Sequence, residues 1–224
     1  MSFIDQPWQP DIQWGAPAGQ LLRALAAALP SERPISLTVF GSAPLQLGIE
    51  PSFQSADVDV FSTEDLRSWI KSAGVGEGQS AFYIQQSPEF VFSASASWRE
   101  RAFSVALKNV TFTFPHPIDI LVSKLKRLEP KDLNAFRLVF DATSHPTPEE
   151  LKRALQRHVD LFRPNFDEEN SGDAVANTQV VWRELYGQTI DVRREIIAPA
   201  LQWRRTAYGE DLPSLKNELP DAEI

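Results

Sequence analysis

Two aspartates one residue apart, Asp57 and Asp59, are the strongest candidates for joint chemistry in this sequence. They stand in the segment DVDVF, where acidic and apolar residues alternate. Because side chains alternate along a strand, both carboxylates would point to one face while Val58 and Val60 point into the core. Two carboxylates about 7 Å apart repel each other unless a cation lies beside them, and Mg²⁺ prefers such oxygen ligands. The spacing predicts a divalent-metal site, and the alternative is an ordinary exposed strand face.

A glycine and a serine precede this pair at the end of another expected strand. Gly41 and Ser42 directly follow the β-branched and apolar segment ISLTVF. Glycine lets a backbone approach a phosphate closely, and Ser42 with the N–H groups of the next turn could hold phosphate oxygens. The alternative is that Gly-Ser only makes a turn. The combination of this turn with the acidic pair favours a phosphate-binding metal site over two unrelated features.

Composition limits the remaining chemistry. The 22 Lys and Arg are outnumbered by 30 Asp and Glu, so the formal charge is -8 and any nucleic-acid site must be local. The absence of cysteine excludes thiolate nucleophiles, disulfides and cysteine-ligated zinc, and the three histidines lack ligand spacing. We find no apolar stretch long enough to span a bilayer and no secretory leader, so we expect a cytoplasmic protein without a membrane partner.

The elements that must position these residues form a mixed α/β pattern. Apolar periodicity, interrupted by Pro, Gly and Ser residues, predicts strands over 35–40 and 57–61. It also predicts helices over 19–29, 44–47 and 66–73, the last with Thr63 as an N-cap. Residues 81–114 carry β-forming runs, including FVFSASA, and predict an antiparallel meander. The last third predicts helices over 118–128, 130–140, 147–162, 174–186 and 189–203.

These elements predict an α/β (α+β) fold with a mixed sheet core and a C-terminal helical part. We expect an irregular arm over residues 1–18, the core over 19–142, a helical region over 143–208 and a flexible tail over 209–224.

The Gly-Ser turn and the Asp-x-Asp strand resemble the nucleotidyltransferase superfamily with the palm of the DNA polymerase beta type. A second stretch, PIDILVSKLKRLEPKD over 117–132, looks like the Pro-x-Asp, Lys-Leu and Lys-Asp run of bacterial nucleotidyltransferase-like families. Those families are related to abortive-infection and toxin–antitoxin enzymes. The resemblance implies a Mg²⁺-dependent enzyme that moves NMP from an NTP to a hydroxyl group of an RNA, a protein or a small molecule.

The resemblance also implies roles for individual residues. Gly41, Ser42 and Lys124 would bind the nucleotide. Asp57 and Asp59 would hold the metal, and Asp132 would be a further catalytic carboxylate. Asp132 follows Pro130 in a first helical turn, where an acid also simply complements the helix dipole.

Two departures from the family pattern support an alternative. No basic residue stands just before Asp57, where Gln54, Ser55 and Ala56 are found. The third carboxylate of polymerase-like members lies on a later strand, and here Glu89 is the only acid within the expected middle strands. The alternative is a non-catalytic nucleotidyltransferase-like partner, such as a component of a toxin–antitoxin or phage-defence pair, that binds protein or nucleotide.

A basic stripe in the last third is a further candidate for binding an RNA acceptor. Helical spacing places Lys152, Arg153, Arg157 and His158 along one outward side of the expected helix. An ordinary solvated helix face gives the same pattern.

Overall fold

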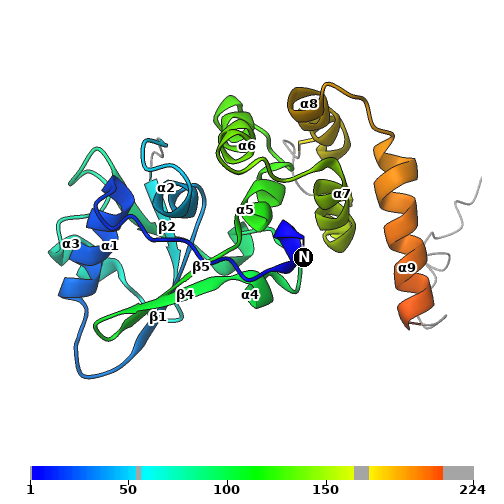
Figure 1. Ribbon diagram of the computed structural model, residues 1–224. Helices are drawn as coiled ribbons and strands as arrows, with labels where there is room; N and C mark the ends of the chain where they lie inside the picture. The colour runs from blue at the N-terminus through cyan, green and yellow to red at the C-terminus, as the bar shows by residue number, and fades with distance from the viewer. Residues whose placement is uncertain (1, 54–56, 164–171, 209–224) are drawn as a thin grey trace, which may run out of the picture.

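A five-stranded mixed sheet forms the centre of the computed structural model, which describes residues 2–53, 57–163 and 172–208 (Figure 1). The strands are β1 (Ile35–Phe40), β2 (Asp57–Phe61), β3 (Tyr83–Gln86), β4 (Phe103–Leu107) and β5 (Val110–Phe114). Their order in the sheet is β3-β2-β1-β5-β4. β1 pairs antiparallel with β2 and parallel with β5, while β2 pairs parallel with β3 and β4 antiparallel with β5. The expected fold class, a mixed sheet followed by helices, is confirmed.

One face of the sheet is covered by three helices. They are α1 (Pro17–Ala28), α2 (Ala43–Gly48) and α3 (Arg67–Ser72). Leu22 and Leu25 of α1 pack in one buried cluster with Val39, Val58 and Phe112 of the sheet. The alternation of buried and partly exposed residues along β2 follows from this one-sided burial, since Val58 and Val60 point to the helices. The opposite face of β2 therefore carries the two aspartates.

The last third of the chain packs as helices beside the sheet, with α5 and α6 in the centre of Figure 1 and α7, α8 and α9 at its right. The helices are α5 (Pro117–Lys124), α6 (Pro130–Thr143), α7 (Pro148–Arg157), α8 (Ala174–Tyr186) and α9 (Ala198–Tyr208), with the short 3₁₀ helix η3 (Val159–Phe162) and the π-helix η4 (Arg193–Ile197). Phe40 from β1 belongs to the same buried cluster as Phe136 of α6 and Trp182 of α8, so the sheet and the helical layer share a core.

The N-terminal arm lies against this helical layer. Its turn η1 (Phe3–Asp5) buries Ile4 completely, and Phe3 stacks on His145 with ring centroids 4.7 Å apart. Asp5 forms ion pairs with Arg153 and Arg157 of α7. An arm that looks irregular in sequence is thus anchored by contacts to residues far along the chain.

Several expected elements are corrected. The helix expected over 147–162 ends at Arg157, because the backbone turns at His158, whose side chain points inward to Ser93 at 3.0 Å. Where FVFSASA (90–96) predicts a strand, the chain forms the end of the turn η2 (Glu89–Val91) and then irregular backbone, and the short helix α4 (Trp98–Arg101) follows it.

The remaining corrections concern helix ends and pairing. The expected helix 118–128 ends as α5 at Lys124, and α3 begins after Leu66 rather than at a Thr63 cap. β3 joins the sheet parallel to β2, not as part of an antiparallel meander. Over the described residues, no helix has both the length and the apolar character needed to cross a membrane.

Candidate functional site

The acidic pair lies half-buried on the face of β2 that the three helices leave uncovered. Asp59 lies between Phe40 of β1 and Gln85 of β3 in the sheet register. The side-chain amide nitrogen of Gln85 is 2.9 Å from Asp57 Oδ2 and 2.7 Å from Asp59 Oδ1. The hydroxyl of Ser87 donates to Asp59 Oδ1 at 2.9 Å. A single amide group thus bridges both carboxylates, which shows that the two side chains converge as the alternation predicts.

The electrostatics of the pair favour a bound cation. Burial raises the pKa of the Asp57 carboxyl, and the charge of Asp59 raises it further, against a smaller opposing effect of nearby Lys131, Lys124 and Arg127. Both causes penalise the second negative charge on this face. A cation beside the two carboxylates would offset both.

Gly41 packs directly against this pair. Its backbone is in the left-handed region with φ of 70°, and a Cβ atom placed on it would lie 2.7 Å from Asp59 Oδ2. Another residue type would be strained at this φ, and its Cβ would force the Asp59 carboxylate to shift. The glycine turn and the acidic strand therefore meet at one point, as expected from the sequence.

Lys124 connects the turn to the second sequence motif. Its ammonium group donates to Ser42 Oγ at 3.0 Å and to Asp132 Oδ1 at 3.0 Å. The lysine is largely buried, which is tolerated because a carboxylate accompanies it. Ser42 and Lys124, two predicted nucleotide-binding residues, are thus in direct contact.

Asp132 lies behind Lys124 and is completely buried. It is the N3 residue of a capping box at the start of α6, where the backbone N–H of Glu129 donates to Oδ2 at 3.0 Å. Arg127 pairs with the same carboxylate at 3.1 Å. Burial alone would raise the pKa of Asp132, but Lys124, the Glu129 N–H and Arg127 outweigh it and lower the pKa. The ionised carboxylate is thus tied to two cations and a helix end.

A pocket opens beside these residues. It has a volume of about 570 Å³, within the range of ligand-binding sites. Its lining includes Gly41, Asp59, Lys124 and Arg127, together with the apolar segment 90–92 and Phe40. The structure therefore brings three of the predicted site residues to one cavity, and Asp57 and Ser42 adjoin it through Asp59 and Lys124.

The donor set suits Mg²⁺ in the way that phosphate-handling sites use it. Among the described residues, no group of three or more His, Cys, Asp or Glu side chains is placed to hold a metal. Mg²⁺ is usually held by one or two carboxylates and completes its shell with water and substrate phosphates. Asp57 and Asp59 meet that requirement.

No third carboxylate joins the pair from the neighbouring strand. The β3 residue opposite Asp59 is Gln85, and Glu89 instead forms an ion pair with Arg99. The residues that sequence reasoning missed are therefore Gln85, Ser87 and the pocket residue Arg127. The alternation in YIQQ marks Gln85 as facing one way, but only the pairing of β3 with β2 shows that it faces the aspartates.

The expected basic stripe on α7 is only partly an outward surface, because its cations are paired with acids of other segments and His158 is buried. Lys152 pairs with Glu195 at 3.1 Å, and Arg153 pairs with Asp5 at 3.0 Å. Arg157 also pairs with Asp5, and His158 is buried against Ser93. The reason is that η1 and the last helices pack along α7, so these side chains hold the helical layer together.

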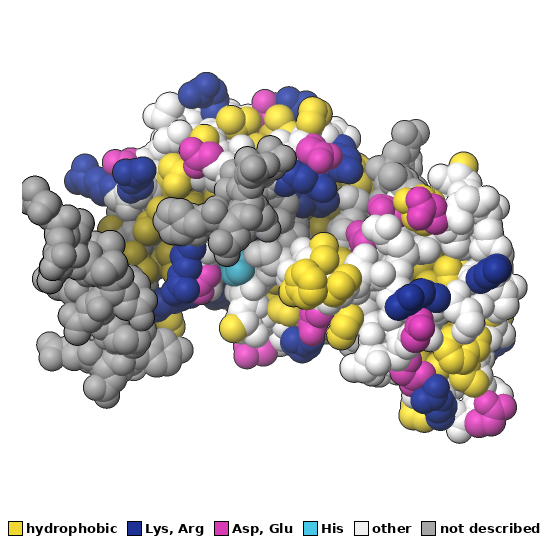
Figure 2. Space-filling model, turned by 180° about the vertical axis from the view of Figure 1, so that it is seen from behind, with side chains coloured by type: hydrophobic (Ala, Val, Ile, Leu, Met, Phe, Trp, Pro, Cys, Tyr) yellow, Lys and Arg dark blue, Asp and Glu magenta, His cyan; other side chains and the backbone are white. Residues whose placement is uncertain are grey.

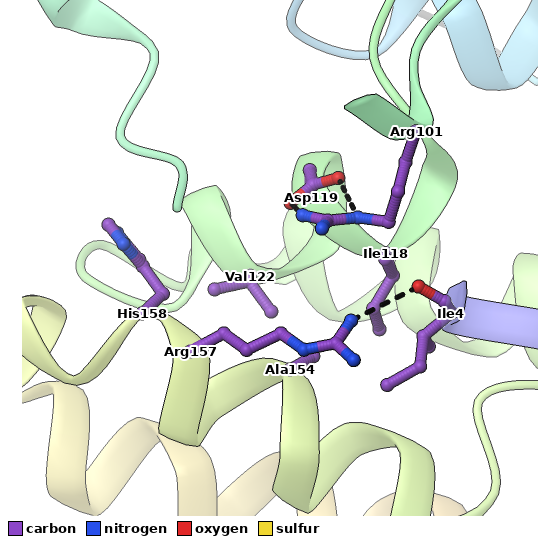
Figure 3. Close-up of a pocket in the computed structure, with 8 residues that line it drawn as sticks. All are labelled: Ile4, Arg101, Ile118, Asp119, Val122, Ala154, Arg157 and His158. Atoms are coloured by element: carbon purple, nitrogen blue, oxygen red, sulfur yellow. Dashed lines mark hydrogen bonds and ion pairs between the residues drawn. The ribbon is translucent and has the colours of Figure 1, made fainter. Parts of the chain in front are cut away.

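A second hollow, between α4, α5 and α7, is too small for a substrate (Figure 3). Its volume of about 10 Å³ leaves room for at most one water molecule. Arg101 and Asp119 form a buried ion pair at its edge, with nitrogen and oxygen 2.7 Å apart. Asp119, in the first turn of α5, is thus a structural residue that is paired with Arg101.

Comparison with known families places this site in context. A family model described as a nucleotidyltransferase of unknown function (DUF6036) matches residues 20–138, more than half of the chain. The chain belongs to this family. No curated protein and no solved structure matches it significantly. The match spans the sheet, the acidic pair and the segment with Lys124 and Asp132, and it ends within α6.

Proposed function

We propose that this protein is a Mg²⁺-dependent nucleotidyltransferase that moves NMP from an NTP to a hydroxyl acceptor on an RNA, a protein or a small molecule. The observation that carries the proposal is the contact of Gly41 with Asp59 in the same pocket as Lys124. A phosphate-approach turn, a metal-binding acid and a cation thus converge where a triphosphate would lie.

In this proposal the chain's own residues mainly position the phosphate chain and neutralise its charge. Gly41 admits the phosphate chain next to the acidic pair, and the Ser42 hydroxyl and the Lys124 ammonium group bind its oxygens. A divalent ion held by Asp57 and Asp59 would supply charge neutralisation at the reacting phosphate. The acceptor oxygen forms a bond to the α-phosphorus as the bond from that phosphorus to the β-phosphate oxygen breaks, and pyrophosphate leaves. The proton of the attacking hydroxyl passes to a carboxylate of the Asp57–Asp59 pair, of which Asp59 lines the pocket.

Asp132 contributes indirectly in this scheme. Its complete burial and its bonds to Lys124, Arg127 and the start of α6 favour a positioning role, with Lys124 as the residue that it positions. A direct catalytic role for Asp132 stays a sequence-based prediction.

One observation favours a second candidate function, the non-catalytic partner protein. Gln85 stands beside the acidic pair where an acid would complete a set of three, and its amide nitrogen bonds to both aspartates. A protein without catalytic activity could retain an acidic pair whose oxygens are held by a neutral amide in this way. It would then act by binding a cognate protein.

Transfer assays with labelled NTP and Mg²⁺ test the choice. An enzyme transfers label to an acceptor in RNA or protein fractions, and the Asp57→Asn, Asp59→Asn double variant abolishes the transfer. A matched control is Asp65→Asn, Glu100→Asn, which removes the same charge from exposed positions. If the double aspartate variant retains transfer activity, the proposal is wrong.

A further inference from the structure

The turn η2 presents exposed hydrophobic side chains at the pocket. Of the exposed large hydrophobic residues in the described part of the chain, Phe90 and Val91 line this pocket. Phe90 is 85% exposed. This is an unusual state for an aromatic side chain, because removing its apolar surface from water is favourable. Hydrophobic side chains also gather near the middle of the face in Figure 2, with Lys and Arg side chains nearby. Such an exposed apolar group beside a cavity indicates a surface that a ligand covers.

The exposure of Phe90 is imposed by fixed neighbours. Phe92 is buried and packs on Phe40 and Trp98, with ring centroids 5.7 and 5.5 Å apart. On the other side of the turn, Glu89 pairs with Arg99, whose guanidinium lies 4.6 Å from the ring centroid of Trp98. With both ends of η2 anchored, the Phe90 ring is held away from the core.

The pocket thus combines two kinds of surface. Gly41, Asp59, Lys124 and Arg127 suit the phosphates and their cation, whereas Phe90, Val91 and Phe92 offer apolar area. A ligand that fills both parts has a polyanionic end and a flat apolar end. Nucleoside triphosphates have both.

We propose that Phe90, with Val91 beside it, is the stacking platform for the base of the bound nucleotide. This inference rests on the proposed function, because it takes the phosphates to lie at Gly41 and Lys124. Stacking on an aromatic ring tolerates every base, since each has a π-face. The platform therefore sets nucleotide affinity and not a preference for one base.

Calorimetric titration with two probes, Mg–ATP and Mg–tripolyphosphate, tests the inference. We expect Phe90→Ala to weaken ATP binding about ten-fold and to leave tripolyphosphate binding unchanged, because only ATP carries a base. Phe90→Trp should restore wild-type affinity for ATP. A matched control is Trp203→Ala, which removes another exposed aromatic side chain, 66% exposed, from α9 outside the pocket lining.

The two probes separate the possible failures. Wild-type affinity for ATP in Phe90→Ala would overturn the platform while leaving the nucleotide site intact. Equal wild-type affinities for ATP and tripolyphosphate would also overturn it, because the base would then contribute nothing. If the wild-type protein binds neither probe, the proposed function fails and the platform fails with it.

Discussion

The ammonium group of Lys124 lies 3.0 Å from the hydroxyl oxygen of Ser42, across 82 positions of sequence. This contact joins the glycine turn after β1 to the end of α5. On its other side the same ammonium group meets the buried carboxylate of Asp132, so one lysine links the proposed phosphate site to the start of α6. Binding and stability are therefore coupled at this residue.

Replacing Lys124 should affect both properties, and a double variant should separate them. Lys124→Met leaves Asp132 buried with Arg127 as its remaining cationic partner, so we expect a loss of about 3 kcal/mol in the free energy of unfolding, along with loss of Mg–NTP binding. Adding Asp132→Asn removes the buried charge and should restore most of the stability without restoring binding. Urea denaturation and calorimetry measure the two effects. Recovery of binding in the double variant would show that Lys124 does not contact the nucleotide.

Gly41→Ala should destabilise the folded protein by more than the left-handed backbone conformation alone would. A matched control is Gly74→Ala, since Gly74 has a similar φ of 68° but open space around its Cα. We expect about 1 kcal/mol of destabilisation for Gly74→Ala from the left-handed backbone. Gly41→Ala should exceed this, because the new methyl group meets Asp59, and it should abolish Mg–NTP binding. Equal destabilisation and intact binding in both variants would mean that the Asp59 contact has no consequence.

Gln85→Glu should make stability depend on Mg²⁺. A third carboxylate beside Asp57 and Asp59 adds repulsion when no cation is bound and adds a ligand when one is. We expect the variant to melt below the wild-type protein in chelator and to gain more in melting temperature than the wild-type protein on addition of Mg²⁺. Gln85→Ala serves as the control, because it removes the bridging amide without adding charge. If the melting temperature of Gln85→Glu does not change on addition of Mg²⁺, no metal binds at the acidic pair.

His116 predicts a pH dependence of stability. It is buried as the N-cap of α5, where Nδ1 accepts a hydrogen bond from Ile118 N–H, and burial together with the charge of Arg101 lowers its pKa to about 3. The unfolded chain has an ordinary histidine pKa of about 6.5, so it binds the proton first as the pH falls. The contribution of a neutral His116 is therefore complete above about pH 6.5 and is lost progressively towards pH 3, at up to about 1.4 kcal/mol per pH unit.

The variant His116→Asn keeps a capping acceptor and removes the titration. Urea denaturation at pH 7.5 and pH 5 should give a smaller loss of stability for the variant than for the wild-type protein. Equal losses would mean that His116 accepts a proton in the folded state as readily as in the unfolded one.

Much of the sheet and part of the site could be predicted because they are encoded locally. The two-residue alternation of DVDVF fixes which way Asp57 and Asp59 point, and ISLTVF followed by glycine marks the adjoining strand and its turn. The boundaries of β1 and β2 match the prediction for this reason.

What could not be predicted depends on contacts between distant segments. Nothing local in YIQQ shows that β3 runs parallel to β2 and places Gln85 against the aspartates. Likewise, the basic residues of α7 have the spacing of a solvated stripe, and only the packing of η1 reveals that Asp5 pairs with Arg153 and Arg157. The turn at His158 depends on its inward contact with Ser93, which lies 65 residues away in sequence.

Calorimetric titration of the protein with NTP in Mg²⁺, in parallel with the Asp57→Asn, Asp59→Asn variant, tests the proposed nucleotide site most directly. We predict that the wild-type protein binds NTP in Mg²⁺, that chelation of the metal abolishes binding, and that the folded variant does not bind. Binding that survives both chelation and loss of the two aspartates would contradict a metal-assisted nucleotide site at β2, and so would a folded wild-type protein that binds no NTP.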